Sequence, residues 1–144
     1  MDLVAEQGAD ALPVVPRSGP YLAADFVATV RERSGLALDY SPGSLALVDR
    51  IIDGLRRGEP QAAHLARTLL TLGAYTGEVL VRSAGAVWVE FDTGQRAIFG
   101  QPLGVRTPDG RLWNPLGKAV KRYENGSRDS LRLFCLAVAG RTKG

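Results

Sequence analysis

The sequence has 144 residues and a mass of 15.4 kDa, which is the size of one domain. With 45% hydrophobic and 23% charged residues, its composition excludes a chain that is disordered throughout. The sequence has one cysteine, Cys135, which excludes an intramolecular disulfide, and one histidine, His64, so the two are too few for a zinc site built from Cys and His ligands. No apolar run approaches the roughly 20 residues of a membrane span.

Charge is divided unevenly along the chain. Residues 1–92 hold 12 acidic and eight basic side chains, for a net charge of −4, whereas residues 93–144 hold three acidic and ten basic ones, for +7. A basic segment of this kind attracts phosphates and other anions, although a solvated surface has the same composition. The sequence therefore favours a solvated basic surface and leaves nucleic acid open as a partner.

The two ends of the chain are expected to lie outside the folded domain. Residues 1–20 mix acids, glycine and proline without a period, which predicts a disordered N-terminal arm. They lack the basic start and apolar core of a secretory signal. We expect a single domain over residues 21–140 and a frayed tail over residues 141–144.

Three helices are predicted in the first half of this domain. The first spans residues 21–35, and Gly35 is placed to end it. The second opens with Ser41-Pro42, which is typical of an N-cap followed by a first-turn proline. The third, over residues 62–82, is apolar nearly all round, so we expect it to be the central element.

Gly73 and Gly77 lie four residues apart on this third helix. Each costs about 1 kcal/mol of helix stability relative to alanine. Their spacing predicts that the backbone of a neighbouring element approaches the helix closely at this face.

After Gly85 the apolar period changes to two, which indicates β-strands. Four short strands are predicted, at residues 87–91, 96–99, 103–107 and 111–113, and the last two flank the turn Pro108-Asp109-Gly110. Two helices follow, one opened by Asn114-Pro115 and the other by Ser127. Because strands and helices are grouped rather than alternating, the sequence predicts an α+β fold with an antiparallel meander.

Charged side chains on two of these helices are assigned to solvent. On the second helix, Asp49 and Asp53 lie opposite the apolar stripe. On the helix that follows Asn114, the same pattern places Lys118, Lys121 and Arg122 on the outer side. A metal site at Asp49 and Asp53 is therefore not expected.

Glu78 is the one carboxylate within the most apolar helix. It is spaced to pair with Arg82, and a carboxylate in such a place is either structurally paired or tuned by desolvation for catalysis. The structural role is favoured. The alternative is a small enzyme in which Glu78 acts with Tyr75 or Lys118.

Alternation along the strands predicts a second candidate site. If Val87 and Val89 face the helices, Trp88 faces away from them, and the same argument directs Arg106, Arg111 and Trp113 outward. A surface of tryptophan and arginine stacks planar ligands, forms a dimer interface, or is covered by the last two helices.

Three segments together resemble a family of small uncharacterised bacterial proteins of actinobacterial type. The segments are Gly73-Ala-Tyr-Thr-Gly-Glu-Val79, Val87-Trp-Val89 and Asn114-Pro-Leu-Gly-Lys-Ala-Val-Lys-Arg-Tyr-Glu-Asn-Gly126, which match a GAYxGEV helix, a W-V strand and an NPxxKxxKRxENG helix. The resemblance covers residues 62–138. It implies a cytoplasmic α+β domain, transfers no activity, and draws attention to Glu78, Trp88, Asn114 and Lys118.

The sequence as a whole predicts a cytoplasmic, non-enzymatic module that binds a small ligand or a protein. The protein partner can be a second copy of the chain, in a homodimer. The alternatives are binding of nucleic acid or another anionic partner by the basic half, and the enzyme centred on Glu78. No cofactor, metal ion or membrane partner is expected. Ligand or interface candidates are Tyr75, Glu78, Trp88, Arg106, Arg111, Trp113, Asn114 and Lys118.

Overall fold

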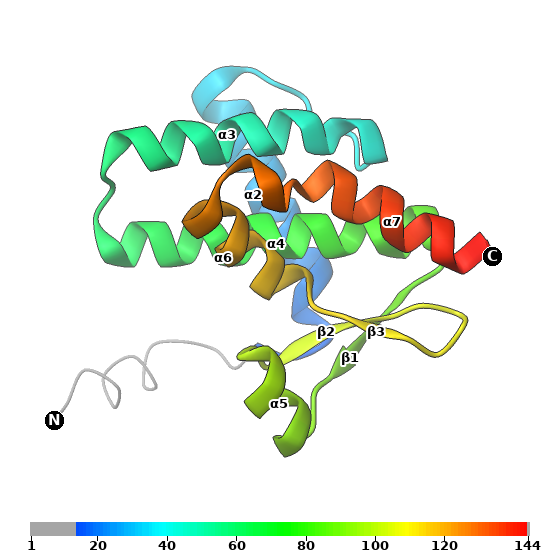
Figure 1. The fold of residues 1–144 in the computed structure, drawn as a ribbon. Helices are drawn as coiled ribbons and strands as arrows, with labels where there is room; N and C mark the ends of the chain where they lie inside the picture. The colour runs from blue at the N-terminus through cyan, green and yellow to red at the C-terminus, as the bar shows by residue number, and fades with distance from the viewer. Residues whose placement is uncertain (1–13, 144) are drawn as a thin grey trace, which may run out of the picture.

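The computed structural model describes residues 14–143 and shows an α+β fold made mostly of helices (Figure 1). In chain order the elements are α2 (Ser18–Ser34), the short 3-10 helix η1 (Pro42–Ser44), α3 (Leu45–Gly58), α4 (Ala62–Ala84), β1 (Val87–Glu90), α5 (Thr93–Phe99), β2 (Leu103–Arg106), β3 (Leu112–Trp113), α6 (Pro115–Asn125), the 3-10 helix η2 (Ser127–Asp129) and α7 (Leu131–Lys143). Among these residues no helix is both long and apolar enough to span a bilayer.

α4 is the centre of the fold, as its apolar sequence predicts. Every residue from Thr71 to Leu80 is buried. In Figure 1, α2 passes behind α4 while α6 and α7 lie in front of it, and all three helices contact it. The sheet lies below these layers and meets α4 through β1 and β2. A helix that is apolar on all sides is thus covered on all sides.

The helix starts that carry a proline are confirmed. The Ser41 hydroxyl accepts a hydrogen bond from the Ser44 backbone at 3.2 Å, and Pro42 opens η1, which leads directly into α3. Asn114 caps α6 in the same way, ahead of Pro115. These side chains satisfy backbone N–H groups that a helix leaves without a partner at its start.

The ends of the domain differ from the expected bounds. α2 begins at Ser18 rather than at Tyr21, and its end at Gly35, a residue in the left-handed conformation with φ of 72°, is confirmed. The rest of the predicted N-terminal arm, residues 1–13, lies outside the described residues. At the other end α7 continues to Lys143, so helix replaces most of the expected tail.

The prediction that Ser127 caps the last helix is wrong. Residues 127–129 form η2, and α7 begins at Leu131. The Ser130 hydroxyl instead accepts a hydrogen bond from the Leu133 N–H at 3.2 Å.

The sheet has three antiparallel strands in the order β1-β2-β3, so the antiparallel meander is confirmed. The predicted strand over residues 96–99 is wrong, because this segment belongs to α5. The Asp92 carboxylate accepts from the Gln95 N–H at 2.8 Å, and the Gln95 side chain accepts from the Asp92 N–H at 2.9 Å. This reciprocal capping box outweighs a period-two pattern of only four residues.

The close approach predicted at Gly73 and Gly77 is present. A Cβ added to Gly73 would lie 2.9 Å from the Cα of Leu116 in α6, so here the neighbour is backbone, as predicted. At Gly77 the neighbours are side chains instead, because a Cβ there would lie 2.7 Å from Cζ2 of Trp88 and 3.1 Å from Cγ of Pro115.

Replacement of Gly73 by alanine is expected to destabilise the protein. Leu116 Cα cannot move without shifting α6, so overpacking costs about 1–3 kcal/mol, or a fall of roughly 3–9 °C in Tm. Gly54→Ala is the matched control, because the nearest atom to its added Cβ is the end of Arg57 at 3.9 Å, and it is expected to keep or raise Tm. A thermal melt in which both variants gain stability would contradict the tight contact of α4 and α6.

Candidate functional site

A cavity of about 430 Å³ opens between α2, α3 and α4, on the part of α4 that lies before its buried centre. Apolar side chains from α2 and α3 form much of its wall: Phe26, Val30, Ile51 and Leu55. Phe26 and Val30 are buried, whereas Ile51 and Leu55 are half-buried. Pockets of this size and apolar character are the usual sites for small organic ligands.

Hydroxyl groups and charges complete the lining. Thr29 of α2 and two threonines of α4, Thr68 and Thr71, lie within the wall. The remaining lining residues are exposed at the mouth: Asp25, Arg33, Ser34, His64 and Arg67. The cavity thus combines an apolar interior with a polar and mainly cationic rim.

The charges at the mouth differ in how they are paired. Arg67 donates a hydrogen bond to the Asp25 carboxylate at 2.6 Å, which ties α4 to α2 across the opening. Within residues 14–143, the side chains of Arg33 and His64 have no hydrogen bond and no ion pair. One guanidinium and one imidazole are therefore available to a ligand.

The sequence analysis did not find this cavity. None of its eight candidate residues lines the cavity, and His64, which does line it, was not among them. Phe26 and Val30 are spaced four residues apart on α2 and are both buried, as the inward face of a helix is. Such spacing holds no signal for the space that remains where α2 meets α3 and α4.

Trp88 faces the helices, so its predicted outward orientation is wrong. It pairs with Val105 in β2, which in turn pairs with Trp113 in β3, and paired residues share one face of a sheet. Val105 is completely buried, so this face is the inner one. Trp113 is also turned inward, and its indole N–H donates to the Thr107 hydroxyl at 2.9 Å.

Arg106 and Arg111 are exposed, as predicted, but they do not share a surface with the two tryptophans. Arg106 pairs with Val87 and Leu112 on the outer face of the sheet. Arg111 forms an ion pair of 3.4 Å with Asp109 in the adjoining turn. The predicted tryptophan and arginine surface is therefore divided between the two faces of the sheet.

The Trp88 indole lies against two glycines. A Cβ on Gly19 of α2 would come within 2.5 Å of Nε1, and one on Gly77 of α4 within 2.7 Å of Cζ2. The indole N–H donates to Oε1 of Glu78 at 3.0 Å. β1 is thus fixed to both helices by one side chain, and the two glycines leave room for it.

Glu78 is buried, and its carboxylate is fully engaged. Oε1 accepts from Trp88, and Oε2 accepts from Nε of Arg82 at 3.3 Å. The Arg82 guanidinium lies 3.6 Å from the centre of the Tyr40 ring. This geometry corresponds to the paired, structural role that the sequence favours.

Tyr75 extends the same cluster. Its ring stacks on Tyr40 at 5.0 Å, and its hydroxyl accepts from the Tyr40 N–H at 2.9 Å and lies 2.6 Å from the Ser44 hydroxyl. Tyr40 has φ of 64°, a left-handed conformation that side chains rarely adopt, so these contacts hold a strained residue in place. Burial raises the pKa of both Tyr40 and Tyr75 above the ordinary value.

Asn114 and Lys118 support α6. The Asn114 side chain accepts from the Gly117 N–H at 3.0 Å and donates to the Phe99 carbonyl at 2.9 Å, which links α6 to α5. The Lys118 ammonium donates to Asp129 at 2.8 Å. In the described part of the chain, neither Lys118 nor Tyr75 is a hydrogen-bond partner of Glu78.

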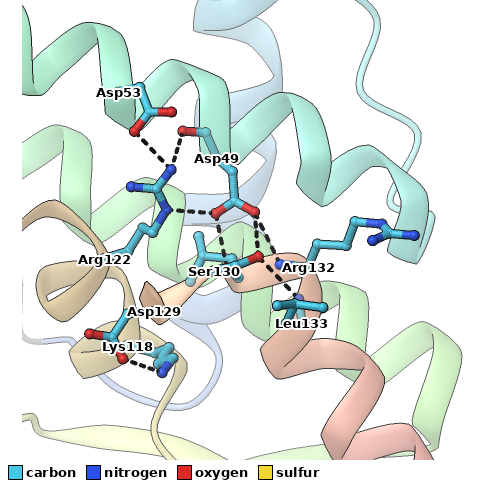
Figure 2. A network of polar contacts seen from close by, with 9 residues as sticks. Asp49, Asp53, Lys118, Arg122, Asp129, Ser130, Arg132 and Leu133 are labelled. Atoms are coloured by element: carbon cyan, nitrogen blue, oxygen red, sulfur yellow. Dashed lines mark hydrogen bonds and ion pairs between the residues drawn. The ribbon is translucent and has the colours of Figure 1, made fainter. Parts of the chain in front are cut away.

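A buried ionic network connects α3, α6 and α7 (Figure 2). Arg122 of α6 is only 2% exposed, and it donates from Nε to Oδ1 of Asp49 at 3.0 Å and from Nη2 to Oδ1 of Asp53 at 2.8 Å. Nη2 also donates to the Asp49 carbonyl at 3.0 Å. Its Nη1 has no hydrogen-bond partner among residues 14–143.

Asp49 also caps α7. Its carboxylate accepts from the backbone N–H of Leu131 at 2.9 Å and of Arg132 at 3.3 Å, and from the Ser130 hydroxyl at 2.9 Å. A carboxylate at a helix N-terminus is favourable for both hydrogen bonding and the helix dipole. One aspartate on α3 therefore fixes the start of α7 and the position of Arg122.

The assignment of Asp49 and Arg122 to solvent is wrong, whereas Asp53 is 40% exposed but is paired with Arg122. Arg122 can be buried because two carboxylates and a carbonyl from α3 accept hydrogen bonds from its guanidinium. The pattern of one helix cannot predict that Arg122 pairs with Asp49, a residue 73 positions away in the sequence. In the described residues, no three His, Cys, Asp or Glu side chains are grouped so that they could hold a metal ion.

Comparison of the chain with protein-family models, with curated proteins and with solved structures finds no match. The resemblance to the bacterial family with the GAYxGEV helix stays a prediction.

Replacement of Asp49 by alanine is expected to destabilise the protein by about 3–5 kcal/mol, because it leaves the Arg122 charge buried without its main partner and removes the cap of α7. Asp53→Ala is the matched control. The Asp53 side chain is 40% exposed and makes one hydrogen bond to Arg122, so a loss of about 1 kcal/mol is expected. Urea denaturation measures both, and equal losses would contradict a central role of Asp49.

Proposed function

We propose that this protein is a cytoplasmic, non-enzymatic module that binds a small organic ligand in the cavity between α2, α3 and α4. The observation that carries the proposal is the cavity itself. Its volume of about 430 Å³ falls in the range of small-molecule sites, roughly 300–1,000 Å³. Four of its twelve lining side chains, those of Phe26, Val30, Ile51 and Leu55, are apolar, and they bind the apolar part of a ligand through the hydrophobic effect.

The positions of the catalytic candidates support binding rather than catalysis. Glu78 is hydrogen bonded to Trp88 and Arg82, and Lys118 to Asp129. None of these residues lines the cavity. A reaction at Glu78 would first have to break contacts that hold β1 to α4.

Self-association is the second role that an observation favours. Leu133 and Leu136 on α7 are 57% and 49% exposed, and both lie on the side of α7 that faces away from the core. An exposed apolar pair on a helix offers contact area to a second copy of the chain. This role is compatible with ligand binding, because α7 does not line the cavity.

A substitution that fills the cavity tests the proposal. Thr29→Trp places a large ring in the half-buried wall, whereas Ala28→Trp places the same ring at an exposed neighbouring position outside the lining and is the matched control. The probe is anilinonaphthalene sulfonate, whose fluorescence rises on transfer to an apolar site. We expect the parent and Ala28→Trp to bind one probe each, and Thr29→Trp to bind at least about tenfold more weakly, a difference of about 1.4 kcal/mol.

Two results would count against this function. One is equal probe binding by both tryptophan variants. The other is binding of several probes to each parent molecule, which indicates general apolar surface. A circular dichroism spectrum and melt of each variant ensures that the comparison is made on folded protein.

A further inference from the structure

The rim of the cavity is electrostatically unbalanced. Among the described residues, Asp25 is the only acidic side chain in the lining, and its charge is already paired with Arg67. In the described part of the chain, the side chains of Arg33 and His64 also line the cavity and have no hydrogen bond or ion pair. The mouth therefore has an excess positive charge of at least one, which an anionic group on the ligand would balance.

Arginine at such a position favours a particular anion. Its planar guanidinium has parallel N–H groups that match the two oxygens of a carboxylate, and this pairing is more specific than a point charge. Because Arg33 is exposed, its hydrogen bonds to water are easily exchanged for bonds to a ligand. The rim thus fits a carboxylate better than a cation or a neutral polar group.

The interior sets the shape of the rest of the ligand. The lining residues of α2 extend from Asp25 to Ser34, which at the helical rise of 1.5 Å per residue is a distance of roughly 13 Å. Phe26 and Val30 lie along this distance, and Ile51 and Leu55 of α3 line the same cavity. An extended alkyl chain or a flat ring system of about that length fits along the apolar part of the cavity.

We infer that the ligand is an amphipathic carboxylate, with its apolar part in the cavity and its carboxylate at the mouth beside Arg33. This inference rests on the proposed function, because it names the ligand class of the same cavity. Asp25 lies eight residues from Arg33 on α2, a distance of about 12 Å, and its charge is already paired with Arg67. Removal of the Asp25 charge should therefore change ligand binding little, whereas removal of the Arg33 charge should weaken it.

The experiment compares three ligands of equal chain length and different charge by isothermal titration calorimetry: decanoate, decan-1-ol and decylammonium. We expect decanoate to bind about tenfold more tightly than decan-1-ol, and decylammonium to bind most weakly. Arg33→Gln should weaken decanoate binding about three- to fivefold, whereas Asp25→Asn should change it less than about twofold. Neither variant should change the affinity for decan-1-ol.

Arg31→Gln is the matched control, because Arg31 is an exposed arginine of the same helix that does not line the cavity. It should leave decanoate binding unchanged. Higher ionic strength should weaken the binding of decanoate and not that of decan-1-ol, because only the charged pair is screened.

The outcomes separate this inference from the proposed function. If all three ligands bind equally and Thr29→Trp abolishes their binding, the cavity is a binding site and the carboxylate inference is wrong. If decylammonium binds most tightly, the inference is also wrong. If none of the three binds, or if binding survives in Thr29→Trp, the proposed function and the inference both fail.

Discussion

The hydrogen-bonded ion pair between Asp49 and Arg122 determines how the helical layers of this protein are arranged. Arg122 is almost fully buried, and removal of a guanidinium from water is costly unless carboxylates and carbonyls replace the lost hydrogen bonds. Asp49 and Asp53 provide them from α3, while Asp49 also caps α7. Because each bond requires a defined geometry, the network fixes α3, α6 and α7 relative to one another (Figure 2).

The cavity is a consequence of where this network holds α3. Asp49 and Asp53 face α6 and α7, Val48 and Ile52 are in the core, and Ile51 and Leu55 face the cavity. α3 is thus held from the side opposite the cavity, and a space remains between it, α2 and α4. At the other end of α2, the Trp88 indole packs against Gly19 and Gly77 and so fixes α2 and α4 to the sheet. The contacts that hold these two helices in place therefore lie outside the cavity.

Local signals in the sequence predicted local structure well. Ser41-Pro42 and Asn114-Pro115 marked helix starts, and Gly73 marked a tight helix contact. Alternation at Trp88 indicated a strand but not which face is buried, since a period of two is the same on both faces. The burial of Arg122 depends on partners far away in the chain, and the cavity depends on how three helices meet, so no local pattern reports either one.

Hydrogen–deuterium exchange in Arg122→Met tests most directly whether the Arg122 network holds α3 in place. This variant breaks the link between α3 and α6 but leaves Asp49 as the cap of α7. Loss of the buried pair should lower the protection of α3 amides by about 100-fold, corresponding to roughly 3 kcal/mol, while the amides from Thr71 to Leu80 of α4 change much less. Lys118→Met, which breaks the more exposed pair with Asp129, is the control and should leave α3 unchanged. Unchanged protection of α3 in Arg122→Met, or an equal loss in α3 and α4, would contradict the account.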